Sequence, residues 1–193
     1  NLGSLPPAQD NLHLLTTLGM IEKVKPVGNS FEGTIIVGGS PRDMIDRLAF
    51  VLNQRETGIE TGTIWFVTKN IEEMQTTQTI LLNPDIPQKI DMRVFNIQKN
   101  TEAEDGLPTT RITDIFQEFL RYKTNQEIHG IWLIVVSQPY IQRHLLCAMN
   151  AAESEGIAAG LNFFEAGPKA DETLPLTTYL IETMQLLGCQ LIA

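Results

Sequence analysis

The sequence predicts an α/β protein built on a doubly wound, mainly parallel sheet of five strands between two helical layers. Short apolar runs rich in β-branched residues alternate along the chain with longer segments in which apolar residues recur at helical spacing. The composition agrees with this class, because 193 residues with 42% hydrophobic and 19% charged side chains are typical of one globular domain. We therefore expect one such domain over residues 33–193, preceded by an arm over residues 1–32.

The first strand and helix have the clearest boundaries. Residues 34–37 form a continuous β-branched run, typical of a strand buried on both faces, and the run stops at two glycines. A helix is expected over residues 40–54, with Met44 and Leu48 on its apolar face. Ser40 is a good N-cap, Pro41 suits the first helical position, and Asp43 stands where the acid of a capping box would be. In the arm, residues 10–20 predict a short helix.

The remaining elements follow in regular alternation. The fourth helix has the strongest amphipathic pattern, and the fourth strand is the most apolar. The helix over residues 71–82 has a weaker pattern because threonines interrupt it. Further strands are expected at residues 63–67, 92–97, 131–136 and 160–165. Further helices are expected at residues 71–82, 110–122, 139–153 and 174–187.

Ligands of doubly wound sheets bind beyond the carboxyl ends of the strands, beside the point where the strand order reverses. If the strand order is 3-2-1-4-5, that point lies between the first and fourth strands. Polar side chains follow both of these strands, at residues 38–43 and 137–144. This sheet would be Rossmann-like, and its ligand site would lie at that edge.

We expect the ligand-binding residues to come from these two segments and from the start of the fourth helix. The two glycines permit a tight turn with space above it, where helix amides favour an anion. Arg42 can contact a phosphate or carboxylate, and Ser137 can cap the next helix while its hydroxyl faces the site. Plain helix capping, without any ligand, is the alternative explanation of both segments. The expected ligand-binding residues are Gly38, Gly39, Arg42, Thr110, Ser137, Gln138, Tyr140 and Arg143.

Other polar residues have ordinary explanations. His144 stands one helical turn after Tyr140, but a lone histidine is more often structural than catalytic. Three other features are weaker candidates: Lys69 for contact with an anionic ligand, Glu165 as a general base, and the acidic loop of residues 100–108 as a cation site.

The chain has no nucleophile-elbow, phosphate-loop or dinucleotide-binding motif, so we assign no catalytic residue and no cofactor. Cys147 and Cys189 lack the neighbours of a metal site and are expected to be small buried hydrophobes.

The charge of the chain excludes some partners. Asp and Glu number 23 against 14 Lys and Arg, so the formal net charge is -9. Nucleic-acid binding needs clustered basic residues, and the chain has no basic run.

No apolar stretch is long enough to cross a membrane. The first residue is Asn1 rather than Met, which indicates a fragment or processed product and leaves the compartment open.

Three segments together resemble the YdcF/SanA/ElyC-like family of bacterial α/β proteins. They are residues 35–49 with the Gly-Gly turn and the Arg-Leu-Ala of the following helix, residues 109–114, and residues 135–143. The resemblance covers about residues 33–179 and implies a polar pocket at the carboxyl edge of the sheet. It also implies envelope or cell-wall roles, and binding of nucleotides or S-adenosylmethionine. The chain departs from the family where Tyr140 replaces a histidine three residues before Arg143, which puts inherited acid–base chemistry in doubt.

The leading hypothesis is binding of a small anionic or nucleotide-like molecule, with hydrolysis or transfer at a phosphate or glycan precursor if the protein is an enzyme. Arg42 and Arg143 would hold the negative group, while Ser137 and Gln138 would orient the rest. The alternative is an interaction protein that binds no small molecule, with its partner surface on the arm. A nicotinamide-dependent oxidoreductase would share the fold, but the glycine-rich fingerprint is missing.

Overall fold

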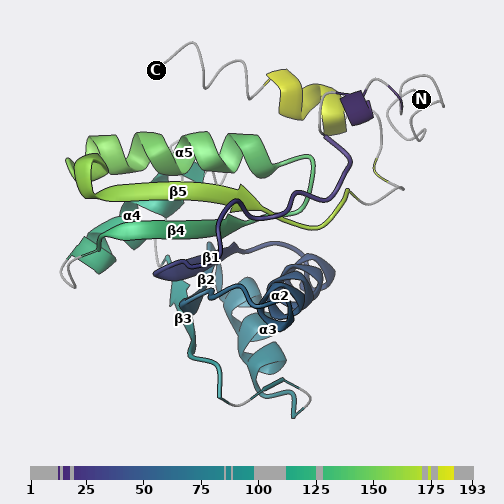
Figure 1. Ribbon diagram of the computed structural model, residues 1–193, viewed down its shortest axis with the longest axis vertical. Coiled ribbons are helices and arrows are strands. Elements are labelled where there is room, and N and C mark those ends of the chain that lie inside the picture. The colour runs from purple at the N-terminus through teal and green to yellow at the C-terminus, as the bar shows by residue number, and fades with distance from the viewer. Residues whose placement is uncertain are drawn as a thin grey trace.

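The computed structural model describes residues 13, 15–17, 20–84, 86, 87, 89–97, 112–124, 128–170, 174 and 178–184. Its five strands form one parallel sheet in the order β3-β2-β1-β4-β5, with helices on both faces (Figure 1). The strands are β1 (Gly33–Val37), β2 (Thr63–Thr68), β3 (Met92–Asn96), β4 (Gly130–Val135) and β5 (Leu161–Ala166). The helices are α2 (Pro41–Glu56), α3 (Ile71–Leu81), α4 (Ile112–Thr124), α5 (Ile141–Ser154) and the 3-10 turn η2 (Ala158–Gly160).

The predicted class and strand order are confirmed. The described boundaries of all five strands and of α2 to α5 lie within two residues of the expected ones. The closing helix differs, because Leu174 is not helical and the described helical residues there are 178–184. Residues 13 and 15–17 of the arm are helical, as expected. No helix in the described part of the chain is both long and apolar enough to cross a membrane.

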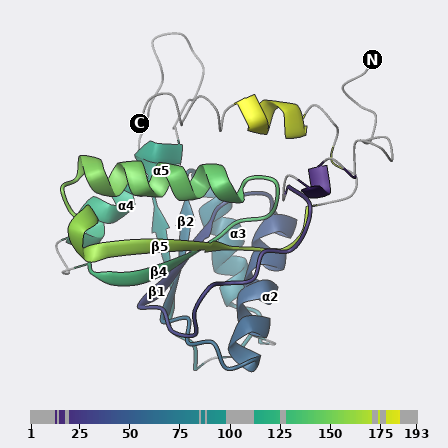
Figure 2. The same ribbon diagram turned by 45° about the horizontal axis from the view of Figure 1, so that its top comes forward.

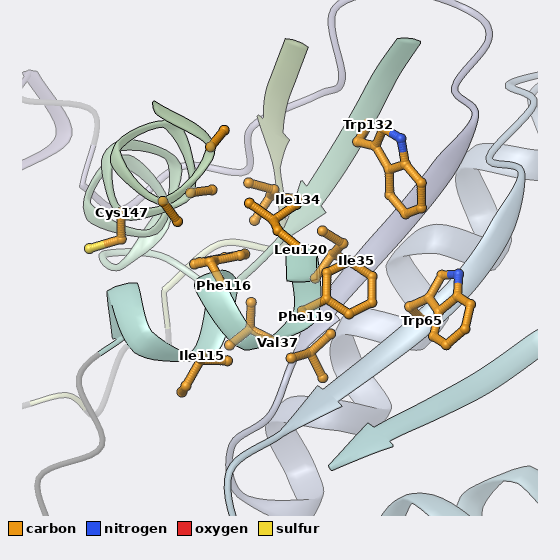
Figure 3. Packing of buried hydrophobic residues seen from close by; sticks show 14 of the residues in the cluster. Ile35, Val37, Trp65, Ile115, Phe116, Phe119, Leu120, Trp132, Ile134 and Cys147 are labelled. Atoms are coloured by element: carbon orange, nitrogen blue, oxygen red, sulfur yellow. The ribbon is translucent and has the colours of Figure 1, made fainter. Parts of the chain in front are cut away.

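One core fills the space between the sheet and the helices α4 and α5 (Figure 3). Ile35 and Val37 of β1 are buried beside Trp65, against Phe116 and Phe119 of α4. The ring of Phe119 makes edge contacts with Trp65 and Trp132, with centroids 5.6 and 6.0 Å apart. Cys147 belongs to this core, so the prediction that it is a small buried hydrophobe is confirmed.

A second core lies on the opposite face of the sheet, under α2 and α3. Ile36 of β1 and Phe66 of β2 are fully buried there, and Leu48 and Val51 of α2 cover them. Because β1 contributes Ile35 to one core and Ile36 to the other, it is buried on both faces, as its continuous apolar run predicted.

The arm and the C-terminal helical residues meet beyond the carboxyl edge of the sheet. Leu15 and Met20 of the arm pack with Ala170 and Tyr179 in a third, smaller cluster. In Figure 2, helical residues 178–184, in yellow, lie above the start of α5. This cluster places both ends of the described chain beside the edge at which the site was predicted.

Candidate functional site

A cleft of about 600 Å³ opens between the carboxyl ends of β1 and β4. It lies where the strand order reverses, since β1 pairs with β2 on one side and with β4 on the other. Its volume falls in the range of small-molecule sites. The residues that line the cleft are Ser40, Arg42, Asp43, Asp46, Ser137, Gln138, Tyr140, Pro168, Lys169, Ala170 and Leu174.

The turn after β1 is built differently from the prediction. A Cβ at residue 38 would overlap the carboxylate of Glu73 and lie 3.2 Å from the carbonyl oxygen of Val67. A Cβ at residue 39 would lie 3.1 Å from Nη1 of Arg47. The expectation that Gly38 and Gly39 leave open space above the turn is therefore wrong, because the protein's own charged side chains fill that space. Neither glycine is among the described residues that line the cleft.

At the start of α2, backbone amides are hydrogen-bonded by side chains of the same turn. The hydroxyl of Ser40 accepts the amide hydrogen of Asp43, and the Asp43 carboxylate accepts from the amide and the hydroxyl of Ser40. The predicted capping box is thus confirmed. The Asp43 carboxylate also lies where a bound anion would meet the helix dipole. The positive end of the α2 dipole is therefore already compensated by the protein. Next to it, Arg42 lines the cleft with an exposed side chain 3.9 Å from Asp46.

Arg47 is the residue that the sequence reasoning missed. It is only 4% exposed, on the same face of α2 as Met44, Leu48 and Val51. Its Nη1 donates to the carbonyl oxygens of Val37 and Gly38, at 2.6 and 3.0 Å. Burial lowers the pKa of Arg47. The signal was present in the sequence, since residue 47 follows Met44 at helical spacing on the apolar face.

Ser137 and Gln138 follow β4 and form the buried floor of the cleft. The hydroxyl oxygen of Ser137 accepts a hydrogen bond from Nε of Arg47 at 3.1 Å. The prediction that Ser137 caps α5 is wrong, because the helix begins at Ile141 and its N-cap is Tyr140, which makes no side-chain capping bond. The peptide bond between Gln138 and Pro139 is cis.

The first turn of α5 differs from that of α2. It has no side-chain cap and no acidic residue, so the positive end of the helix dipole is not compensated locally. Tyr140, the N-cap, lines the cleft, and burial raises the pKa of its phenol, which therefore stays protonated at neutral pH.

Arg143 has another partner than the one expected. Its Nε donates to Oε1 of Glu182 at 2.6 Å, and the two side chains are 16% and 3% exposed. The ion pair joins α5 to helical residues 178–184. Arg143 is not among the described residues that line the cleft, so the structure gives it no place at the predicted anion.

His144 is buried one turn further along α5. Its Nδ1 lies 2.8 Å from the carbonyl oxygen of Tyr140. Burial lowers the pKa of His144 to about 3, and the nearby charge of Arg143 adds to the effect. The ring is therefore neutral near pH 7, so Nδ1 carries the hydrogen and donates it to Tyr140.

The segment after β5 forms the opposite wall of the cleft. Gly167 approaches the carbonyl oxygen of Val136 so closely that a Cβ there would overlap it. The backbone amide of Gln138 donates to the carbonyl oxygen of Pro168. The arm supports this wall from outside, since Val24 and Gly167 form an antiparallel bridge.

The weaker candidates lie elsewhere. Lys69 is exposed and pairs with the buried carboxylate of Glu73 at 3.7 Å. Glu165 lies within β5, one residue before its end, and does not line the cleft described here. Thr110, the acidic loop of residues 100–108 and Cys189 lie outside the described residues. Within the described part of the chain, no group of three or more acidic, histidine or cysteine side chains is arranged to hold a metal ion.

Comparison of the chain with known proteins identifies no related protein. No protein-family model, no curated protein and no solved structure matches the chain. The resemblance to the YdcF/SanA/ElyC-like family therefore stays a prediction.

Proposed function

We propose that the protein binds a small anionic or nucleotide-like molecule in the cleft between the ends of β1 and β4. The observation that carries this proposal is the buried guanidinium of Arg47, which does not itself line the cleft but donates to the hydroxyl of Ser137 on its floor. Among the described residues, no carboxylate lies within 4 Å of it. The carboxylates of Asp43, Glu73 and Asp46 attract this guanidinium only from beyond that distance. Its burial is therefore costly, and an anion bound in the cleft would offset part of that cost.

The remainder of the cleft suits such a ligand. Arg42 and Lys169 stand at the rim, where each can contact an anionic group. The uncompensated start of α5 adds backbone amides on the same side as Ser137. Ala170 and Leu174 give the opposite wall apolar surface for the uncharged part of the ligand.

A thermal-unfolding screen tests the proposal directly. The panel contains inorganic phosphate, pyrophosphate, nucleoside mono-, di- and triphosphates, and S-adenosylmethionine. A ligand at one hundred times its Kd adds about 2.7 kcal/mol to the free energy of unfolding, which is visible as a rise in melting temperature. We expect at least one anion to raise it.

The control variant comes from the other end of the same helix. Arg42→Gln removes a cation at the cleft, whereas Arg55→Gln removes one in the last turn of α2, far from the cleft. We expect Arg42→Gln to weaken binding of the active compound and Arg55→Gln to leave it unchanged. A panel that produces no shift would contradict the proposal and favour the interaction protein without a small-molecule ligand.

A further inference from the structure

We propose that Arg47 is a positioning residue that turns the hydroxyl hydrogen of Ser137 into the cleft, where it donates to an anionic oxygen of the ligand. This inference rests on the proposed function and deepens it. It assigns Ser137 as a ligand-contacting residue and requires an oxyacid group, such as a phosphate, at the floor of the cleft.

The guanidinium is held in a fixed orientation. Nη1 donates to the last carbonyl oxygen of β1, at Val37, and to that of Gly38. Nε then points across the sheet to Ser137, at the end of the neighbouring strand β4. Because the guanidinium is planar, the two bonds of Nη1 also fix the direction of Nε.

The bond from Arg47 decides what the Ser137 hydroxyl does next. Its oxygen accepts the Nε hydrogen, which leaves its single hydrogen to be donated elsewhere. The described part of the chain offers that hydrogen no acceptor at hydrogen-bond distance. Ser137 is buried but lines the cleft, so a ligand in the cleft is the partner within reach.

A second hydroxyl in the same cleft provides a contrast. Ser40 also lines the cleft, but its hydroxyl hydrogen is donated to Asp43 at 2.6 Å. The hydroxyl hydrogen of Ser40 is therefore used in a hydrogen bond within the protein, whereas that of Ser137 is not. Asp43 and Asp46 are on the same side as Ser40, and like-charge repulsion directs an anion away from them and toward Ser137.

The experiment measures the Kd of inorganic phosphate by titration calorimetry for the full chain. Ser137→Ala should raise the Kd about tenfold to hundredfold, the usual effect of a hydrogen bond to a charged group. Ser137→Thr, which keeps the hydroxyl, should restore most of the binding. Ser40→Ala is the matched control, because it removes a hydroxyl from the same cleft, and it should change the Kd less than threefold.

A double-mutant cycle separates positioning from folding. Arg47→Lys keeps the charge but loses the fixed direction of Nε, so it should weaken phosphate binding several-fold in the wild-type background. In the Ser137→Ala background it should have little further effect, because the group that it orients is gone. Circular dichroism confirms that each variant is folded. If Ser137→Ala does not fold, Ser137→Cys, a weaker donor of similar size, takes its place in the cycle.

The outcomes distinguish this inference from the proposed function. Wild-type Kd values for Ser137→Ala, together with weaker binding by Arg42→Gln, would overturn the role of Ser137 and leave the anion site in place. Additive effects of Arg47→Lys and Ser137→Ala would overturn the positioning role. A wild-type protein that binds neither phosphate nor any panel compound would contradict the proposed function, and this inference with it.

Discussion

The carboxylate of Glu73 occupies the space that a side chain at Gly38 would need. Glu73 is buried at the start of α3, and its Oε2 accepts the amide hydrogen of Lys69 at 3.0 Å. Arg47 lies against the other glycine of the turn. The Gly-Gly turn after β1 is thus enclosed by a carboxylate and a guanidinium, and packing explains both glycines without a ligand.

Gly38→Ala should therefore destabilise the fold. The new methyl group would meet the Glu73 carboxylate and the backbone of Val67, and overpacking of this kind costs about 1–3 kcal/mol. The free energy of unfolding from urea denaturation provides the measurement. Gly160→Ala is the control, because a Cβ there meets no atom within 4 Å, and equal losses in the two variants would refute the steric explanation.

The Arg143–Glu182 pair should respond unequally to removal of its two partners. Glu182 is 3% exposed, so Arg143→Leu leaves a buried carboxylate unpaired and should cost about 3–5 kcal/mol. Arg143 is 16% exposed and can turn toward water, so Glu182→Leu should cost less. Thermal and urea unfolding measure both losses.

The exposed Arg93–Asp91 pair sets the scale for this comparison. Both of its side chains are about half exposed, and Asp91→Asn should cost no more than about 1 kcal/mol. If the loss in Arg143→Leu is as small as that in Asp91→Asn, the buried pair does not anchor helical residues 178–184.

His144 should make stability depend on pH. Its pKa is about 3 in the folded protein, against about 6.5 in an unfolded chain. Between these values the unfolded state binds a proton that the folded state does not, so the free energy of unfolding falls as the pH falls. The slope is at most about 1.4 kcal/mol per pH unit, and it begins as the pH drops through 6.5.

Urea denaturation between pH 7 and pH 5 isolates this effect, because carboxylates titrate mainly at lower pH. We expect His144→Gln to flatten the dependence in this window. His129→Gln, which changes an exposed histidine, is the matched variant for comparison. A wild-type protein whose stability is constant from pH 7 to pH 5 would show that His144 is not held neutral by burial.

The sheet could be predicted from the sequence, but the polar contacts at its edge could not. Continuous apolar runs in β1 and β4 reflect burial on both faces, which is a local signal that places these strands at the centre. The capping box of Ser40 and Asp43 is local as well, and it was predictable. The position of the cleft followed from the strand order.

The errors concern partners that are distant in the chain. Arg143 pairs with Glu182, 39 residues away, and Ser137 pairs with Arg47, 90 residues away. Arg47 was overlooked as a member of the site because basic side chains are rarely buried, although it stands on an apolar helix face. The helical spacing indicates that Arg47 turns inward, but no local pattern indicates which distant group it contacts.

The proposed binding of an anion in the cleft between the ends of β1 and β4 can be tested by an amide NMR titration of the full chain with inorganic phosphate. If the anion binds there, we expect chemical-shift changes concentrated at residues 137–143, with smaller changes at residues 40–43 and 168–170. The indole signals of Trp65 and Trp132, which belong to the α4–α5 core, should stay unchanged. Unchanged spectra, or changes confined to the two indoles, would contradict anion binding in this cleft.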